Sequence, residues 1–199
     1  MSETWDNRYS TSTFVYGTEP NVFFKEVVLQ NTPGKILLPA DGEGRNSVYA
    51  ASIGYDVHAF DFSLVAIEKA RQLATARNVT VKYKHADFNV ADKLYPDNSF
   101  DYLALIYTHL PPEVRKLYHN MLLRKLKPGG KLIFEAFSKK QMHRTSGGPK
   151  IEELLYLTDD LRRDFGSLSK LSISENEIVL DEGELHNGAA SVIRIQGVK

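Results

Sequence analysis

The stretch that decides the fold spans residues 36–46 and reads Ile36-Leu37-Leu38-Pro39-Ala40-Asp41-Gly42-Glu43-Gly44-Arg45-Asn46. Its first five residues form an apolar run of strand length, and a turn with alternating acidic residues and glycines follows. A helix is expected directly after the turn, from Arg45 to Ser52, with Gly54 closing it in a left-handed conformation. The stretch therefore predicts a strand, a tight turn and a helix in immediate succession.

The rest of the chain repeats this alternation of strand and helix. Further strands are predicted over residues 55–60, 79–85, 101–107 and 131–137, and a final pair over residues 171–180 and 189–196. Helices are predicted after Ser63, after Pro111–Pro112 and over residues 158–166, where Thr158 is the expected cap. The pattern predicts an α/β fold with a three-layer, Rossmann-like sheet of seven strands, mostly parallel, with a C-terminal strand hairpin.

Length and composition limit the number of domains and the kinds of partner that the protein can have. The chain has 199 residues, 25 Lys and Arg against 25 Asp and Glu, and no Cys, so residues 1–199 are expected to form a single domain. Zero formal charge gives no attraction for nucleic acid or an acidic membrane, and a small-molecule partner is favoured. We find no metal-ligand spacing among the histidines and no apolar run of membrane-spanning length, and we expect a cytoplasmic protein. Oligomeric state has no signal in the sequence.

Ligands of parallel α/β sheets bind at the carboxyl ends of the strands, so the residues that follow each strand are the first candidates for a site. Small residues occupy positions 40, 42 and 44, and Arg45 stands where a dinucleotide fingerprint has its third glycine. Asp41 and Glu43 would repel a phosphate and attract a cation. The loop therefore suits a cationic nucleoside without a pyrophosphate, the alternative being a turn that binds no ligand.

Two more strand ends carry an aspartate. Asp61 follows the second strand, at nearly the spacing from the glycine loop that is typical of the acid holding ribose hydroxyls. Its alternative role is to cap the next helix. Asp87 and Phe88 follow the third strand, where a carboxylate and a ring suit an adenine, and a plain turn aspartate is the alternative.

These features together resemble class I S-adenosylmethionine-dependent methyltransferases, and most closely the small branch related to tellurite-resistance and thiopurine methyltransferases. The resemblance also rests on four shorter motifs: Trp5-Asp6-x-Arg8-Tyr9, Tyr16-Gly17, Leu126-Lys127-Pro128-Gly129-Gly130 and Glu182-Gly183-x-x-His186-x-Gly188. It extends over essentially the whole chain. The implied cofactor is S-adenosyl-L-methionine, and the implied activity is methyl transfer to a small-molecule acceptor.

The family pattern implies a set of cofactor contacts in this chain. They are the backbone at Ala40, Gly42 and Gly44, the side chains of Asp61, Phe62, Asp87, Phe88 and Tyr107, and Trp5 and Tyr16 from the N-terminal segment. The chain departs from the pattern at Leu38, where the family has an acid, and at Ala40, where it has a glycine. The amino group of the cofactor then needs another partner, and we expect Asp41 or the Ala40 carbonyl.

The acceptor side of the site is expected to come from the chain's ends. Residues 1–33 are predicted to be a lid whose aromatic rings shield the sulfonium from water, the alternative being a segment that only packs. Residues 138–149 are predicted to be a loop on the substrate side. His109 and His186 are candidate bases, because imidazole accepts protons near neutral pH. A nicotinamide-dependent oxidoreductase and a non-catalytic nucleoside-binding module remain alternatives.

Overall fold

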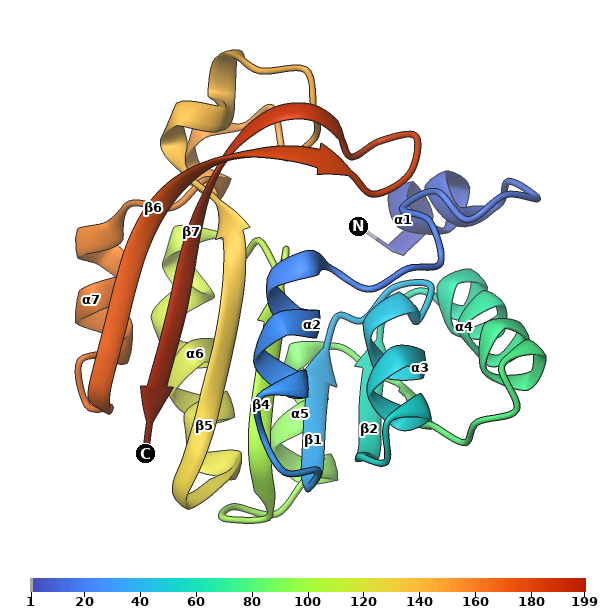
Figure 1. Ribbon diagram of the computed structural model, residues 1–199. Coiled ribbons are helices and arrows are strands. Elements are labelled where there is room, and N and C mark those ends of the chain that lie inside the picture. Colours follow the sequence, from blue (N-terminus) through green and yellow to red (C-terminus); the bar gives the residue numbers. More distant parts are fainter. Residues whose placement is uncertain (1) are drawn as a thin grey trace.

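The computed structural model describes residues 2–199, with side chains from Thr4 onward (Figure 1). The helices are α1 Ser2–Tyr9, α2 Val22–Leu29, α3 Arg45–Ser52, α4 Leu64–Ala76, α5 Phe88–Leu94, α6 Pro112–Lys125 and α7 Thr158–Phe165, with 3₁₀ turns η1 Lys139–His143 and η2 Glu152–Leu154. The strands are β1 Lys35–Pro39, β2 Asp56–Asp61, β3 Lys82–His85, β4 Phe100–Ile106, β5 Leu126–Phe137, β6 Ser169–Asp181 and β7 Asn187–Val198.

All seven strands form one sheet in the order β3-β2-β1-β4-β5-β7-β6. β1 pairs in parallel with β2 and β4, and the parallel ladder continues to β3 and β5. β7 is antiparallel to both β5 and β6, so β6 runs in the same direction as β5. The predicted fold class is confirmed. The turn between β6 and β7 therefore lies at the same sheet edge as the carboxyl ends of the parallel strands.

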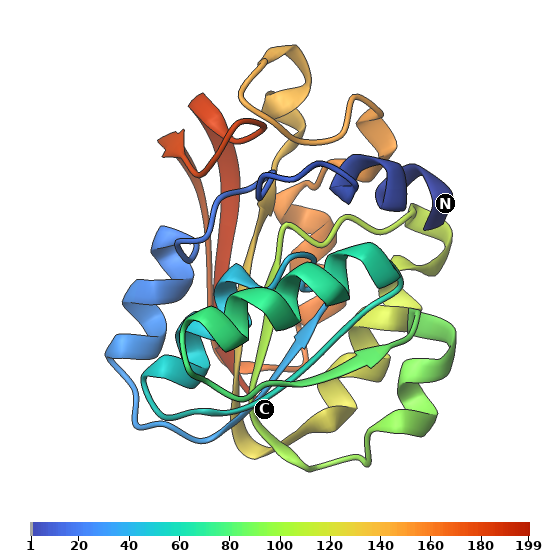
Figure 2. The ribbon, with the colours of Figure 1, turned by 90° about the vertical axis from the view of Figure 1, so that its right-hand side faces the viewer.

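Helices cover both faces of the sheet, which explains the continuous apolar run of β1. Ile36 and Leu38 pack with residues of α2 and α3 on one face, whereas Leu37 packs with residues of α6 and α7 on the other. All three side chains are almost fully buried. Figures 1 and 2 show α2 and α3 on the opposite face from α5 and α6. A strand buried on both sides cannot show polar alternation.

Several predicted boundaries are wrong at one end. β3 starts at Lys82 because Val79 still donates to the carbonyl at the end of α4. β5 starts at Leu126, before the predicted Lys131, because Leu126 already pairs with Phe100 of β4. The Pro-Gly-Gly residues lie within this ladder, at a shift of its register. Thr158 is the first helical residue of α7, and the position before it, Leu157, makes no side-chain cap. Helices α2 and α5 were not predicted.

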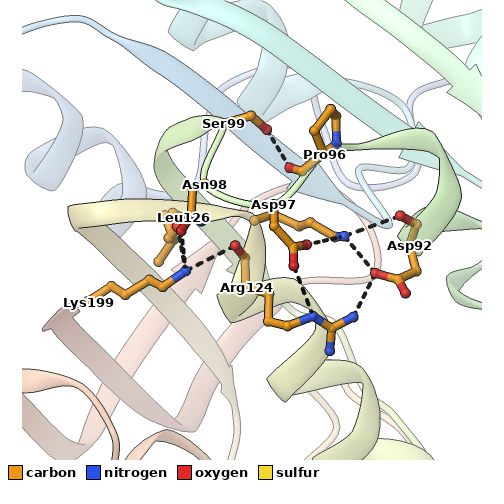
Figure 3. A network of polar contacts seen from close by, with 9 residues as sticks. Asp92, Pro96, Asp97, Asn98, Ser99, Arg124, Leu126 and Lys199 are labelled. Carbon is orange, nitrogen blue, oxygen red and sulfur yellow. Dashed lines mark hydrogen bonds and ion pairs between the residues drawn. The ribbon is translucent and has the colours of Figure 1, made fainter.

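A network of charged side chains lies at the other end of the sheet, away from the carboxyl ends of the parallel strands (Figure 3). The ammonium of Lys125, at the end of α6, contacts Asp92 and Asp97 at 2.6 Å each. Lys199 donates to the carbonyls of Arg124 and Leu126, where a positive charge stabilises the carboxyl end of a helix. The network ties the loop before β4 and the last residue of the chain to α6. It lies outside the predicted site.

Candidate functional site

The glycine loop between β1 and α3 turns sharply at the carboxyl edge of the sheet. Ala40, Gly42 and Gly44 all have positive φ, at 51°, 59° and 87°. Ala40 thus adopts the conformation for which the family uses glycine, at a cost of about 1 kcal/mol. A Cβ at Gly44 would lie 2.7 Å from the Cβ of Ala70 and from the Tyr83 hydroxyl. Gly44 is therefore required for packing against α4.

Gly42 faces the N-terminal segment. A Cβ at this position would lie 2.9 Å from the hydroxyl of Tyr9. The amide of Gly42 donates to the Asp61 carboxylate at 2.8 Å, and the other Asp61 oxygen accepts from the amide of Ser63 at 2.9 Å. Ser63 is the residue that caps α4, through a bond from the amide of Ala66. Asp61 therefore joins the end of β2 to the glycine loop, and burial raises its pKa.

Asp87 and Phe88 lie further along the same edge. Asp87 is exposed and caps α5, accepting from the amides of Asn89 and Val90. Phe88 is half-buried, with its ring 5.5 Å from that of Phe60. The turn role of Asp87 is thus present, and a role toward adenine stays a prediction. Phe62, after β2, is also half-buried.

The two departures from the family pattern have structural counterparts. Leu38 is 2% exposed and belongs to the apolar core under α2, so it supplies no polar group. Asp41 accepts a short hydrogen bond from the Ser47 hydroxyl, which also contacts Tyr83. Burial raises the pKa of Asp41 to about 8. Its other oxygen has no hydrogen-bond partner among residues 2–199.

The N-terminal segment crosses this edge of the sheet, as Figures 1 and 2 show. The rings of Trp5 and Tyr9 stack at 5.5 Å, and Tyr9 and Tyr16 pack with Ala66 of α4. The Asp6 carboxylate accepts from the Ser63 hydroxyl at 2.5 Å. The segment therefore lies over both the glycine loop and the end of β2.

Beyond the glycine loop, four rings gather at the ends of β4, β5 and β6. We call Tyr16, Tyr107, Phe137 and His186 the aromatic box. The His186 ring lies 4.5 Å from Tyr16, 4.6 Å from Tyr107 and 5.3 Å from Phe137, centre to centre. Tyr107 has a φ of 52° and donates to the Glu135 carboxylate at 2.9 Å. The structure thus brings together three predicted site residues from distant parts of the chain.

The two candidate bases differ in what surrounds them. His186 is 5% exposed, and a Cβ at Gly147 would lie 2.6 Å from its Cδ2 and 3.3 Å from its Nε2. The loop of residues 138–149 therefore closes directly onto this ring. Burial lowers the pKa of His186, whereas the Glu182 carboxylate, 3.6 Å from Nδ1, opposes the shift.

His109 is held in one orientation. Its Nδ1 lies 2.7 Å from the carbonyl oxygen of Leu154 and its ring stacks on Phe137 at 5.8 Å. Because a carbonyl only accepts, Nδ1 carries the proton and Nε2 is left as an acceptor. Nε2 is buried and has no hydrogen-bond partner in the part of the chain that the structure describes. Burial lowers the pKa of His109 to about 4, which keeps the imidazole neutral.

Sequence reasoning missed a buried network of charged groups between the glycine loop and the aromatic box. Arg45 pairs with Glu182 at 2.8 Å, and the side-chain amide of Asn21 donates to Glu182 at 3.1 Å and to Glu135 at 2.6 Å. Arg194 pairs with Glu135 at 2.5 Å. Arg45 and Glu182 each belong to a sequence motif, but their pairing across 137 positions has no local signal.

Arg45 retains a free donor in this network. Its second terminal nitrogen, Nη1, is buried and finds no hydrogen-bond partner within residues 2–199. The guanidinium is close enough to Asp41, Tyr107 and His186 to act on the pKa of each. A buried unpaired donor costs about 1–3 kcal/mol, so an anionic ligand group at this point would remove a penalty. No cluster of three potential metal ligands occurs in the same range.

Comparison with known proteins shows a similarity to methyltransferases. Residues 36–130 match a family model described as "Methyltransferase domain". The chain is 31% identical over 133 residues, 65% of its length, to a phosphoethanolamine N-methyltransferase of Triticum aestivum. It spans 25% of the length of that relative.

Solved structures agree on the fold. TehB from Haemophilus influenzae superposes with a TM-score of 0.73 at 17% identity, over 100% of this chain and 66% of the other. A SAM-dependent methyltransferase from Methanosarcina mazei superposes with a TM-score of 0.67 at 19% identity, over 83% of this chain and 92% of the other. The chain therefore shares its fold with Rossmann-like methyltransferases, and slightly less than half of it matches the methyltransferase-domain model.

The residues at the strand ends include groups of the types that S-adenosylmethionine would need. Asp61 carries a carboxylate at the end of β2, which accepts from the amides of Gly42 and Ser63, and the half-buried rings of Phe62 and Phe88 follow β2 and β3. The free Nη1 of Arg45 is a donor suited to the carboxylate of an amino acid. No helix within residues 2–199 has the length and apolar character needed to cross a membrane.

Proposed function

We propose that this protein transfers the methyl group of S-adenosylmethionine to a small-molecule nucleophile at the carboxyl edge of the sheet. The observation that carries the proposal is the position of Arg45. Arg45 follows the glycine loop, which suits a nucleoside. Its Nη1 is an unpaired donor, and its Nη2 pairs with Glu182, whose carboxylate lies 3.6 Å from His186 of the aromatic box. A ligand with a nucleoside at one end and an amino-acid carboxylate at the other matches this order of groups.

The protein's own groups would bind and orient the cofactor. Asp61 would accept the ribose hydroxyls, Phe62 and Phe88 would flank the adenine, and Arg45 would hold the carboxylate. Asp41 or the Ala40 carbonyl would receive the amino group. When bound, the cofactor supplies a methyl group on a cationic sulfur. Positioning and exclusion of water then account for most of the catalysis.

The aromatic box would hold the acceptor next to the sulfonium. Electron-rich faces, such as those of Tyr16 and Tyr107, attract a cation with roughly 0.5–2 kcal/mol each. His109 would accept a proton from the nucleophile through its free Nε2, because its Nδ1 is already committed to Leu154, and it would act as a weak base, since burial lowers its pKa to about 4. The loop of residues 138–149, which packs on His186 through Gly147, would close the acceptor side.

The acceptor is proposed to be small. Tellurite, thiols, thiopurines and small carboxylates are candidate acceptors, and TehB is a structural neighbour. Phosphorylated amines are added to the candidates because the wheat relative is a phosphoethanolamine N-methyltransferase. We propose the branch related to tellurite-resistance and thiopurine methyltransferases on the sequence motifs. The cytoplasm is the proposed compartment, on the absence of Cys from the chain.

A labelled-methyl transfer screen over these acceptors tests the proposal. One acceptor should take up label with the wild-type protein. His109→Asn, which keeps a donor for the Leu154 carbonyl, should slow transfer by roughly 10²–10⁴-fold to an acceptor that must lose a proton. Cofactor binding without transfer to any acceptor would instead favour the non-catalytic nucleoside-binding module.

A further inference from the structure

Lys69 of α4 occupies an unusual position for a lysine. It is 9% exposed, and its ammonium donates to the backbone carbonyls of Tyr9, Thr11 and Thr13 at 3.2, 3.1 and 2.6 Å. The ammonium also lies 5.2 Å from the centre of the Phe14 ring. The segment thus curves so that three of its carbonyls, two residues apart, point at a single ammonium.

The counter-ion of Lys69 is on the glycine loop. One oxygen of Glu43 forms an ion pair with the Lys69 ammonium, and the other accepts from the amide of Val15 at 2.8 Å and that of Tyr16 at 3.4 Å. Glu43 is 4% exposed. One carboxylate of the loop between β1 and α3 therefore contacts both the anchor on α4 and the backbone of the N-terminal segment.

These contacts determine where two rings lie. Tyr9, whose carbonyl Lys69 holds, has its hydroxyl over Gly42, and Tyr16, whose amide Glu43 holds, belongs to the aromatic box. Residues 10–13 are themselves exposed, so apolar burial does not hold the bend between the two rings. The three carbonyls would be hydrated if the ammonium were removed. Tyr9 and Val15 pack with Ala66 on either side of the bend, so we expect the charge of Lys69 to determine the position of residues 10–13 between them.

We propose that Lys69 is a positioning residue that, through Glu43, closes the N-terminal segment over the glycine loop and so couples the order of this lid to cofactor binding. The inference rests on the proposed function for the identity of the ligand. The closure itself rests on the contacts of Lys69 and Glu43. Lys69 touches neither the expected nucleoside side chains nor the aromatic box, and it acts through the backbone that it holds.

Fluorescence of Trp5 tests the proposal, because Trp5 is the single tryptophan and lies in the segment. Lys69→Met keeps most of the length of the side chain and removes the ammonium. Quenching of Trp5 by acrylamide should rise in the free variant, and the affinity for S-adenosylhomocysteine should fall on the order of tenfold, a typical coupling between sites. Arg71→Met, on an exposed position of the same helix, is the matched control and should change neither readout.

Lys69→Met leaves Glu43 buried without its partner and could unfold the protein for that reason alone. A double variant that removes both charges controls for this effect. In Glu43→Gln/Lys69→Met both charges are absent, and the carboxamide oxygen introduced on the glycine loop can still accept from the amide of Val15. This variant should keep the wild-type far-ultraviolet circular dichroism and still show the increased quenching. Wild-type quenching and affinity in a folded double variant would overturn the proposal. If the wild-type protein did not bind S-adenosylhomocysteine, the proposed function would fail, whereas the quenching of the free variants would still decide the role of Lys69.

Discussion

Burial of a neutral His109 has a consequence for stability that can be measured without any ligand. The pKa is about 4 in the folded protein and about 6.5 in the unfolded chain. Below pH 6.5 the unfolded chain takes up a proton that the folded protein does not, so this residue lowers stability as pH falls from 6.5 towards 4. Integrating the two titrations between pH 7 and pH 5 gives a loss of about 2 kcal/mol.

Replacement of His109 by Asn isolates this contribution. The amide nitrogen of Asn occupies nearly the position of Nδ1 and can donate to Leu154, but Asn does not titrate. Urea unfolding of both proteins at pH 7 and pH 5 should show that the variant's deficit relative to the wild type shrinks by about 2 kcal/mol at the lower pH. An equal deficit at pH 7 and pH 5 would show that folding does not lower the pKa of His109. Proton nuclear magnetic resonance of the imidazole should place its titration near pH 4.

Three further outcomes follow from the site's geometry. Gly44→Ala should destabilise the protein by about 3 kcal/mol or more in urea unfolding, because a strained φ is added to contacts at 2.7 Å with Ala70 and Tyr83. Gly129→Ala is the control: its φ is 81° and the space around it is open, so it should cost about 1 kcal/mol. Asp41→Asn should gain stability relative to the wild type as pH rises from 5 to 8 in thermal unfolding. Burial raises the pKa of Asp41 to about 8, so over this range the folded wild type keeps a proton that its unfolded chain releases, and the wild type loses stability; parallel curves would contradict this. Asp87→Ala should cost about 1 kcal/mol through loss of the α5 cap, and an unchanged affinity for S-adenosylhomocysteine would show that the carboxylate does not meet the adenine.

The sequence predicted the parts of this fold that depend on local patterns. The apolar run at Ile36, the cap at Ser63 and the prolines at the start of α6 each act within a few residues, and each was located correctly. Boundaries were less accurate at Val79 and Leu126, where hydrogen bonds to a preceding helix or a shifted ladder decide where the strand begins.

The candidate site was predictable in its residue types and much less so in its pairings. Asp61 and Tyr107 were chosen because they follow strands, and the structure places both at the expected edge. No pattern indicated that Glu43 would bind a lysine of α4 and the backbone of Val15, or that Asn21 would join two carboxylates. These contacts join segments that only the folded sheet brings together. Long-range pairing of polar groups leaves no periodicity in the sequence.

Calorimetric titration of the wild-type protein with S-adenosylhomocysteine, and with NAD for comparison, shows whether the carboxyl ends of the parallel strands bind S-adenosylmethionine. We expect saturable binding of one S-adenosylhomocysteine per chain at micromolar affinity, about −8 kcal/mol, and no heat of binding with NAD. If S-adenosylhomocysteine did not bind, or NAD bound in its place, this part of the sheet would not be a site for S-adenosylmethionine.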